Sequence, residues 1–336
     1  KHRRIRNGEN YGGAMYYMED YFKNKKRNTF GYVFAFVFTI MCLLNCFSMG
    51  CMIQSNAISD AFKEVLNVPA VTIGIIVSIL SIIVFFFNGK KIFSLCEKLV
   101  PFVSIIYCFM CIVIIVLSYK KVPAVFEQII KEAFSFDTVG AGAMGFLISK
   151  SIRYGTVRGL FSNEAGCGTS PIAHATSNTN SPAEQGCLGI IEVFIDTMLI
   201  CTLTALVILL NQDKVIMQGE SSIMIAFSAF FATLGEFSNI VLCICVFLFA
   251  FATIVCWGYY GKECIYFINK SEKAEKGFYF IYVVFVFLGA VISMESVWQI
   301  ADFAIAVMTV MNLITLALLS KEVKEETFSH NKRALK

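Results

Sequence analysis

Seven apolar runs in this 336-residue chain are long enough to cross a lipid bilayer as helices. A hydrocarbon core about 30 Å thick requires roughly 20 apolar residues, because lipid offers no hydrogen-bond partner to free backbone groups. An all-α integral membrane protein is therefore the predicted fold class. The runs cover residues 30–52, 71–87, 99–118, 188–210, 240–260, 278–294 and 297–319.

Charged residues make up only 15% of the chain, whereas about a quarter is usual for a soluble domain. The formal net charge of +4 does not indicate a nucleic-acid partner, because Lys and Arg lie in short connectors and not on a folded soluble face. Most of the 13 cysteines lie inside the apolar runs, which favours small buried side chains over a disulfide framework. The lipid bilayer is the expected surrounding, and no resident metal is indicated.

An eighth span is predicted over residues 138–154, which contain Gly140, Gly142 and Gly145. With this span and a cytoplasmic start, 23 of the 28 Lys and Arg residues lie on the cytoplasmic side. That distribution follows the positive-inside rule and predicts a multi-pass protein of the cell membrane with both termini in the cytoplasm. The inner connectors are then residues 1–29, 88–98, 150–187, 261–277 and 320–336.

The glycines of this eighth segment allow two interpretations. They match G-x-G-x-x-G, but a dinucleotide site requires a strand-to-helix turn in a βαβ unit, and the surroundings here are membrane helices. One interpretation is that the glycines permit close helix packing. The other is that they let the helix unwind at mid-membrane and expose main-chain groups to an ion and a small zwitterion.

Two carboxylates lie four residues apart in one apolar run, at Glu192 and Asp196, and so share a helix face. A carboxylate deep in a bilayer requires a partner, water or a proton. We hypothesise that repulsion between the two keeps one of them protonated, with a role in gating or proton binding. The alternative is that Asp196 is a hydrogen-bonded structural residue.

Three polar or aromatic residues in other runs are candidate ligands. Gln54 could coordinate a polar substrate, or end a helix at the water interface. Thr253 could ligate sodium, and Trp257, one turn later, could wall a pocket. The alternatives are that Thr253 bonds its own backbone and that Trp257 anchors the helix at the interface.

The polar stretch 155–181 is expected to face the cytoplasm. Ser162 or Ser170 with His174 would be the residues of a membrane-embedded hydrolase, but the spacing of a nucleophile elbow is missing. No enzyme activity is therefore predicted.

This same stretch carries a long motif, Arg-Gly-Leu-Phe-Ser-Asn-Glu-Ala-Gly-Cys-Gly-Thr-Ser-Pro-Ile-Ala-His at residues 158–174. With it, the chain resembles the alanine or glycine:cation symporter family over essentially its whole length. The resemblance extends to residues 12–19, 54–61, 97–101, 194–197 and 251–257.

The resemblance implies a LeuT-type fold, in which two inverted five-helix repeats hold the substrate at mid-membrane. It implies symport of alanine or glycine with sodium by alternating access, with sodium as coupling ion and no other cofactor. Serine as substrate and protons as coupling ion stay open. Glu192 departs from the family, which usually has a small residue there. The implied substrate residues are Gln54, Gly142, Gly145, Phe146 and Trp257, and the implied sodium ligands are Thr253 and Ala250.

The chain opens with Lys1 inside what resembles the loop after the family's third membrane helix. We therefore expect one membrane domain, residues 1–336, that is truncated at its N-terminus and has an incomplete first repeat. Its predicted parts are a cytoplasmic loop at 1–29, the rest of the first repeat at 30–118 and the second repeat at 119–336. A non-transporting remnant is the alternative function.

Overall fold

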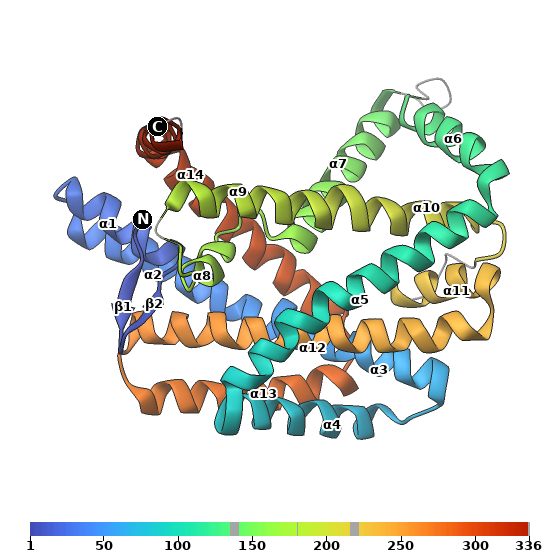
Figure 1. Cartoon of the computed structure of the whole chain (residues 1–336), viewed down its shortest axis with the longest axis horizontal. Coiled ribbons are helices and arrows are strands. Elements are labelled where there is room, and N and C mark those ends of the chain that lie inside the picture. Colours follow the sequence, from blue (N-terminus) through green and yellow to red (C-terminus); the bar gives the residue numbers. More distant parts are fainter. Residues whose placement is uncertain (135–140, 180, 216–221, 335–336) are drawn as a thin grey trace.

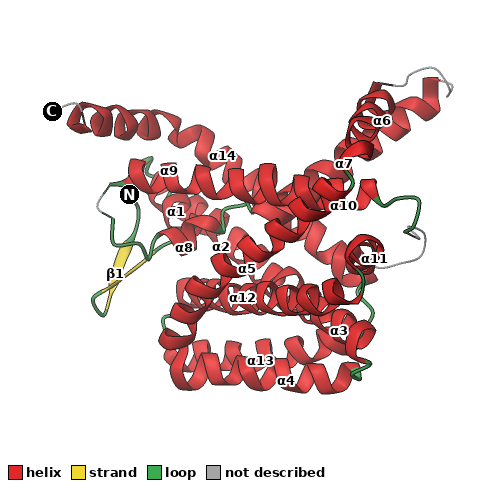
Figure 2. Cartoon of the chain, turned by 45° about the vertical axis from the view of Figure 1, so that its right-hand side comes forward, coloured by secondary structure: helices red, strands yellow, loops and turns green. Residues whose placement is uncertain are grey.

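The computed structural model describes residues 1–134, 141–179, 181–215 and 222–334, and in them it is almost entirely helical (Figures 1 and 2). A short hairpin of β1 (Arg4–Arg6) and β2 (Glu9–Tyr11) precedes the helices. The helices are α1 (Ala14–Asn24), α2 (Asn28–Asn45), η1 (Cys46–Met52), α3 (Ile53–Leu66), α4 (Ala70–Ile82), η2 (Ile83–Asn88), α5 (Gly89–Leu117), η3 (Tyr119–Lys121), α6 (Val122–Phe134), α7 (Ala141–Asn163), α8 (Ser170–His174), α9 (Pro182–Val193), η4 (Phe194–Cys201), α10 (Thr202–Leu210), α11 (Ser222–Leu234), α12 (Glu236–Ile268), α13 (Glu272–Val291) and α14 (Glu295–Ala334).

Within the described residues, six helices are long and apolar enough to cross a membrane, and each overlaps one of the predicted apolar runs. The seventh run forms the apolar helix Ala70–Phe86, which has 17 residues and is short for a span. The eighth predicted span lies partly outside the described residues, so the count of eight stays a prediction. The six long helices are Asn28–Leu66, Lys98–Leu117, Pro182–Leu210, Glu236–Ile268, Glu272–Val291 and Glu295–His330.

The core lies around α12, which packs against α2, η1, α3 and α13. Ile254 and Trp257 of α12 are buried there with Phe38 of α2 and Tyr282 of α13. The Tyr282 hydroxyl donates a hydrogen bond of 2.8 Å to the Ile254 carbonyl oxygen. Apolar side chains also cover the outside of the bundle, as expected for a protein whose solvent is lipid.

The segment predicted as a cytoplasmic loop, residues 1–29, is instead folded. The hairpin turns at Asn7 and Gly8, which both have positive φ as a tight two-residue turn requires. Helix α1 packs against α2 and buries Met15 and Met18 completely. The segment is thus folded against the bundle, because the apolar face of α1 is too short to be recognised as a span but long enough to pack, and its cytoplasmic side stays a prediction.

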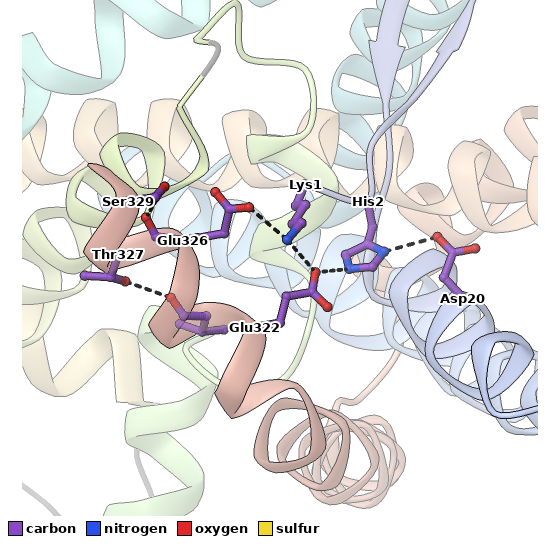
Figure 3. A network of polar contacts seen from close by, with 8 residues as sticks. Lys1, His2, Asp20, Glu322, Glu326, Thr327 and Ser329 are labelled. Carbon is purple, nitrogen blue, oxygen red and sulfur yellow. Dashed lines mark hydrogen bonds and ion pairs between the residues drawn. The ribbon is translucent and has the colours of Figure 1, made fainter. Parts of the chain in front are cut away.

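Both chain ends lie at the same end of the molecule (Figure 1). The Lys1 ammonium forms ion pairs with Glu326 at 2.8 Å and with Glu322 at 3.3 Å, both on α14. The His2 ring lies between Glu322 at 3.0 Å and Asp20 of α1 at 3.2 Å (Figure 3). These contacts tie the start of the chain to α1 and to the last turns of α14.

Helix α7 ends at Asn163, and an irregular loop, Glu164–Thr169, separates it from the short helix α8; we call α7, this loop and α8 together the interrupted helix. Glu164, Gly166 and Gly168 have φ values of 51°, 81° and 91°, which lie in the left-handed region that ends a right-handed helix. A side chain at Gly168 would also be strained by contact with Phe38, whose ring would lie 2.9 Å from the added Cβ. The loop therefore depends on glycine at this position.

Within the described residues, the break does not lie at Gly142 or Gly145, and Gly140 of the predicted eighth span lies outside them. Helix α7 runs without interruption from Ala141 through Gly142 and Gly145. A glycine inside a helix costs only about 1 kcal/mol relative to alanine, so glycines alone do not unwind one. The interruption lies about twenty residues later, where the backbone takes up positive φ.

Candidate functional site

The loop between α7 and α8 is held by the side chain of its own first residue, Glu164. The Trp257 indole Nε1 donates a hydrogen bond of 2.9 Å to Glu164 Oε1. The Thr169 hydroxyl donates one of 2.5 Å to Glu164 Oε2. One carboxylate thus joins the two ends of the loop to the middle of α12.

A second contact fixes the loop to α14. Asn312 Nδ2 donates a hydrogen bond of 2.8 Å to the Gly166 carbonyl oxygen. The Tyr17 hydroxyl of α1 donates in turn to Asn312 Oδ1. Because Trp257 and Asn312 both lie in the interior of candidate membrane spans, the loop lies inside the bilayer region and not at its surface.

The end of α7 is bound to η4. The Ser162 hydroxyl donates a hydrogen bond of 2.7 Å to Asp196 Oδ2, and Asn163 Nδ2 donates one of 2.8 Å to Thr197 Oγ1. A π-helix is uncommon and often occurs at functional sites, where it widens the turn and redirects side chains. Here it places two consecutive polar residues against the helix end that precedes the loop.

Further along α7, Arg158 Nη2 forms an ion pair of 3.2 Å with Asp302 of α14. Its guanidinium lies over the Trp298 ring at 4.3 Å from the centroid. The first residues of the stretch 155–181 therefore belong to a helix that packs on α14, and the side of the membrane on which the stretch lies stays a prediction. The four other connectors that are predicted to be cytoplasmic hold 20 of the 28 Lys and Arg residues, and their side of the membrane stays a prediction.

A cavity of about 1030 Å³ reaches from the chain termini to this loop. At its open end it is lined by Lys1 and Glu326, and at its inner end by Ala165 and Gly166. We call this cavity the vestibule. It extends from residues near the two chain termini to the loop between α7 and α8.

Glu192 and Asp196 have separate partners. Glu192 Oε2 lies 3.3 Å from His174 Nε2 in the wall of the vestibule. Asp196 accepts hydrogen bonds from Ser162 and, at 3.3 Å, from Thr197. Each carboxylate thus has a polar partner of its own, and the structural interpretation of Asp196 agrees with its contacts, while the hypothesis that repulsion keeps one of the two protonated stays a prediction.

Two of the other predicted ligands, Gln54 and Thr253, form hydrogen bonds within their own helical segments, and the third, Ala250, is buried. Gln54 Nε2 donates to the Met49 carbonyl oxygen at 3.2 Å, and Thr253 Oγ1 donates to the Phe249 carbonyl oxygen at 2.9 Å. Both therefore bond their own helices. Ala250 is buried two turns before Trp257 on α12.

The glycine-rich end of α7 is far from Trp257. Gly142, Gly145 and Phe146 lie 17 to 21 residues before the end of α7, which corresponds to about 25–32 Å along the helix axis. The structure therefore does not bring these three predicted pocket residues to Trp257, because the break lies at the other end of the helix.

The residues of the hydrolase alternative are not assembled for catalysis. Ser162 gives its hydroxyl hydrogen to Asp196, and His174 Nδ1 accepts from Gln185 Nε2 at 2.7 Å. Among the residues that the structure describes, neither Ser162 nor Ser170 has a hydrogen bond to His174.

Sequence reasoning missed Glu164 and Asn312 as the residues that hold the loop. Asn312 is an amide inside the apolar run 297–319, which is a signal that it has a buried partner. For Glu164 the signal was Gly166, Gly168 and Pro171 close behind it, since glycines and a proline mark irregular backbone.

Comparison of the sequence with known proteins finds one transporter family and several of its members. The model of the sodium:alanine symporter family matches residues 1–336. A sodium/alanine symporter, AgcS, of Methanococcus maripaludis is 31% identical over 330 residues, which are 97% of this chain and 70% of that protein. A probable sodium/glutamine symporter, GlnT, of Bacillus subtilis is 33% identical over 315 residues, 93% of this chain and 63% of that protein.

An uncharacterized transporter of Haemophilus influenzae is 33% identical over 332 residues, 98% of this chain and 71% of that protein. The chain thus spans 63 to 71% of the length of these three curated relatives. The family match runs from the first residue to the last, and by itself it gives no support to the expected N-terminal truncation.

Proposed function

The chain belongs to the sodium:alanine symporter family, and from this premise we propose that it moves a small neutral amino acid across a cell membrane together with sodium. Transport proceeds by alternating access, and sodium moving down its gradient supplies the driving force. Alanine or glycine is the amino acid. No covalent chemistry is required of the chain.

The observation that carries the proposal is the interrupted helix at membrane depth, reached from one side through the vestibule. Irregular backbone inside a bilayer occurs where it is buried in protein or lines a water-filled cavity. In carriers, such interrupted helices offer free main-chain groups to the charged ends of a substrate. The Glu164–Thr169 loop has this placement, and Trp257 beside it supplies an aromatic wall.

The remaining parts of the proposal follow the family. Gln54 and Trp257 contact the substrate, and Thr253 with Ala250 contributes to the sodium site. In this form Gln54 and Thr253 are the donors of the bonds to their own helices, so Gln54 Oε1 and the lone pairs of Thr253 Oγ1 are the atoms that would accept from the substrate and ligate sodium. The architecture is of the LeuT type, with residues 119–336 as its second repeat.

The vestibule opens to the cytoplasm in this proposal. Both termini lie at its open end, and the connectors at that end carry most of the Lys and Arg residues. The conformation is then inward-open, with the loop accessible from the cytoplasmic side only.

The test is sodium-dependent binding and uptake with chain 1–336 reconstituted in liposomes. We expect an inward sodium gradient to drive accumulation of labelled alanine or glycine, and replacement of sodium by choline to abolish it. Liposomes without protein and liposomes with a collapsed gradient are the controls. Sodium-dependent binding without uptake would favour the non-transporting remnant, and absence of both would contradict the proposal.

A further inference from the structure

A chain of hydrogen bonds in the vestibule wall ends at Glu192. The Ser177 hydroxyl donates to Gln185 Oε1 at 2.8 Å, and Gln185 Nε2 donates to His174 Nδ1 at 2.7 Å. On the far side of the ring, His174 Nε2 lies 3.3 Å from Glu192 Oε2. Gln185, His174 and Glu192 all line the vestibule.

The hydrogen bond from Gln185 sets which nitrogen of the His174 ring carries the hydrogen in this structure. With the Gln185 amide oriented as in this structure, its donor nitrogen faces His174 Nδ1, which then accepts and carries no hydrogen. The ring hydrogen is then on Nε2 and points at Glu192. The imidazole in this contact orients the Glu192 carboxylate through its Nε2.

The charge of Glu192 is also available to a ligand. Its side chain is 69% exposed in the cavity wall, and among the described residues no partner is found for Oε1. The cations at the open end of the vestibule are engaged elsewhere. Lys1 pairs with Glu322 and Glu326, and Arg3 donates to the carbonyl oxygens of Ser177 and Thr179.

We propose that Glu192, oriented by His174, is an ammonium-binding subsite in the vestibule. It holds the ammonium group of an amino acid on its way between the loop and the open end, and this role rests on the proposed function. A metal ion is a poorer occupant, because hard cations take several oxygen ligands and a single carboxylate in an open wall offers too few. Among the described residues no cluster of three metal-ligating side chains is present.

The test measures occupancy directly and needs no transport. A cysteine introduced by Gly189→Cys places its Cβ 3.5 Å from His174 Nε2, next to the subsite. The substitution is made together with Cys187→Ala, because Cys187 is an exposed native thiol on the same helix. The rate of modification by a small thiol reagent is then measured with the reconstituted chain 1–336.

Three probes separate the chemical classes. Ethylamine carries the ammonium group without a carboxylate, propionate carries the carboxylate without an ammonium group, and sodium chloride supplies the metal ion. We expect ethylamine to slow modification and the other two to leave it unchanged at equal concentration. Equal protection by sodium chloride or by propionate would overturn the assignment to an ammonium group.

Glu192→Gln then tests the residue itself. Exposed ion pairs contribute up to about 1 kcal/mol, so the half-protecting ethylamine concentration should rise about fivefold in this variant. Glu184→Gln is the matched control, because Glu184 lies on the same helix and bonds Thr179 instead of lining the vestibule. An unchanged half-protecting concentration in Glu192→Gln overturns the subsite.

The two proposals can fail separately. Loss of ethylamine protection in Glu192→Gln without any sodium-dependent uptake would support the subsite and contradict symport. Sodium-driven uptake with unchanged protection in Glu192→Gln would support symport and contradict the subsite.

Discussion

The indole nitrogen of Trp257 lies 2.9 Å from a carboxylate oxygen of Glu164. Trp257 is almost fully buried in α12 at the centre of the core, and Glu164 is the residue directly after α7. This single hydrogen bond therefore connects the position of the interrupted helix to the position of α12. A conformational change that moves one of the two must move the other or break the bond.

Two substitutions of Glu164 should separate hydrogen bonding from charge. Glu164→Gln keeps an oxygen for the Trp257 indole and leaves an amide next to the Thr169 hydroxyl, which can also accept. We expect its unfolding free energy to stay within about 1 kcal/mol of the parent chain. Glu164→Leu leaves the indole N–H and the hydroxyl unpaired and should cost about 2–3 kcal/mol. Thermal unfolding of the purified chain measures both.

Equal stability of the Gln and Leu variants would contradict this role of the Glu164 carboxylate. Uptake measurements on the stable Gln variant add the second readout. If the charge of Glu164 is also needed in the transport cycle, sodium-driven uptake should fall although the fold is intact.

Gly50→Ala should separate η1 from α12. A Cβ at Gly50 would lie 2.5 Å from Trp257 Cβ, so one of the two helices must shift. Overpacking of this kind costs about 1–3 kcal/mol, and here it also displaces the partner of Glu164. We expect a lower unfolding temperature and weaker alanine binding.

The matched control for Gly50→Ala is Gly155→Ala. Gly155 lies inside α7, and a Cβ added there would have no neighbour within 4 Å. Alanine there should be neutral or stabilise by about 0.5–1 kcal/mol through helix propensity. Similar losses in both variants would show that the contact with Trp257 is not the cause.

Arg6→Met should release the N-terminal hairpin from the bundle. Arg6 forms ion pairs with Glu263 at 3.4 Å and Glu275 at 3.1 Å, and its guanidinium lies 4.0 Å from the Tyr266 ring centroid. Glu263 is 1% exposed, so losing its partner leaves a buried charge unpaired, at a cost of about 3 kcal/mol.

Arg6→Lys should recover only part of this loss, because an ammonium group cannot bridge two carboxylates and stack on a ring as a planar guanidinium does. Arg4→Met is the control, because Arg4 pairs with partly exposed Asp20 and should cost less than about 1 kcal/mol. Thermal unfolding measures all three variants, and equal costs at the two arginines would contradict the assignment.

Much of the fold could be predicted from the sequence, because membrane helices are specified by the length and apolarity of a run. The six long helices confirm this, and most of them extend several residues beyond the predicted run at one or both ends. The break in the interrupted helix could not be located in this way. Gly142 and Gly145, like Gly166 and Gly168, are closely spaced glycines among small residues, and only the backbone conformation separates the two pairs.

The residues of the candidate site also divide into one that the sequence indicated and others that it did not. Trp257 was identified from its place in an apolar run and in a family motif, and the structure puts it at the loop. Its partner Glu164 was assigned to a cytoplasmic stretch, because polarity alone does not distinguish a surface loop from a buried irregular one. The contacts of Asn312 and Tyr17 join positions 295 residues apart, which a single sequence does not reveal.

A double-mutant cycle on Arg158 and Asp302 should show that the end of α7 is coupled to α14. The two are 3.2 Å apart and each is partly exposed, so we expect a coupling free energy of about 1 kcal/mol. Arg158→Met alone also removes the cation from the face of Trp298, whereas Asp302→Asn leaves that contact in place. The single arginine variant should therefore be the less stable of the two by about 0.5–1 kcal/mol. Additive effects of the two substitutions in thermal unfolding would place the motif 158–174 away from α14, and the interrupted helix would then lose one of the contacts that hold it at membrane depth.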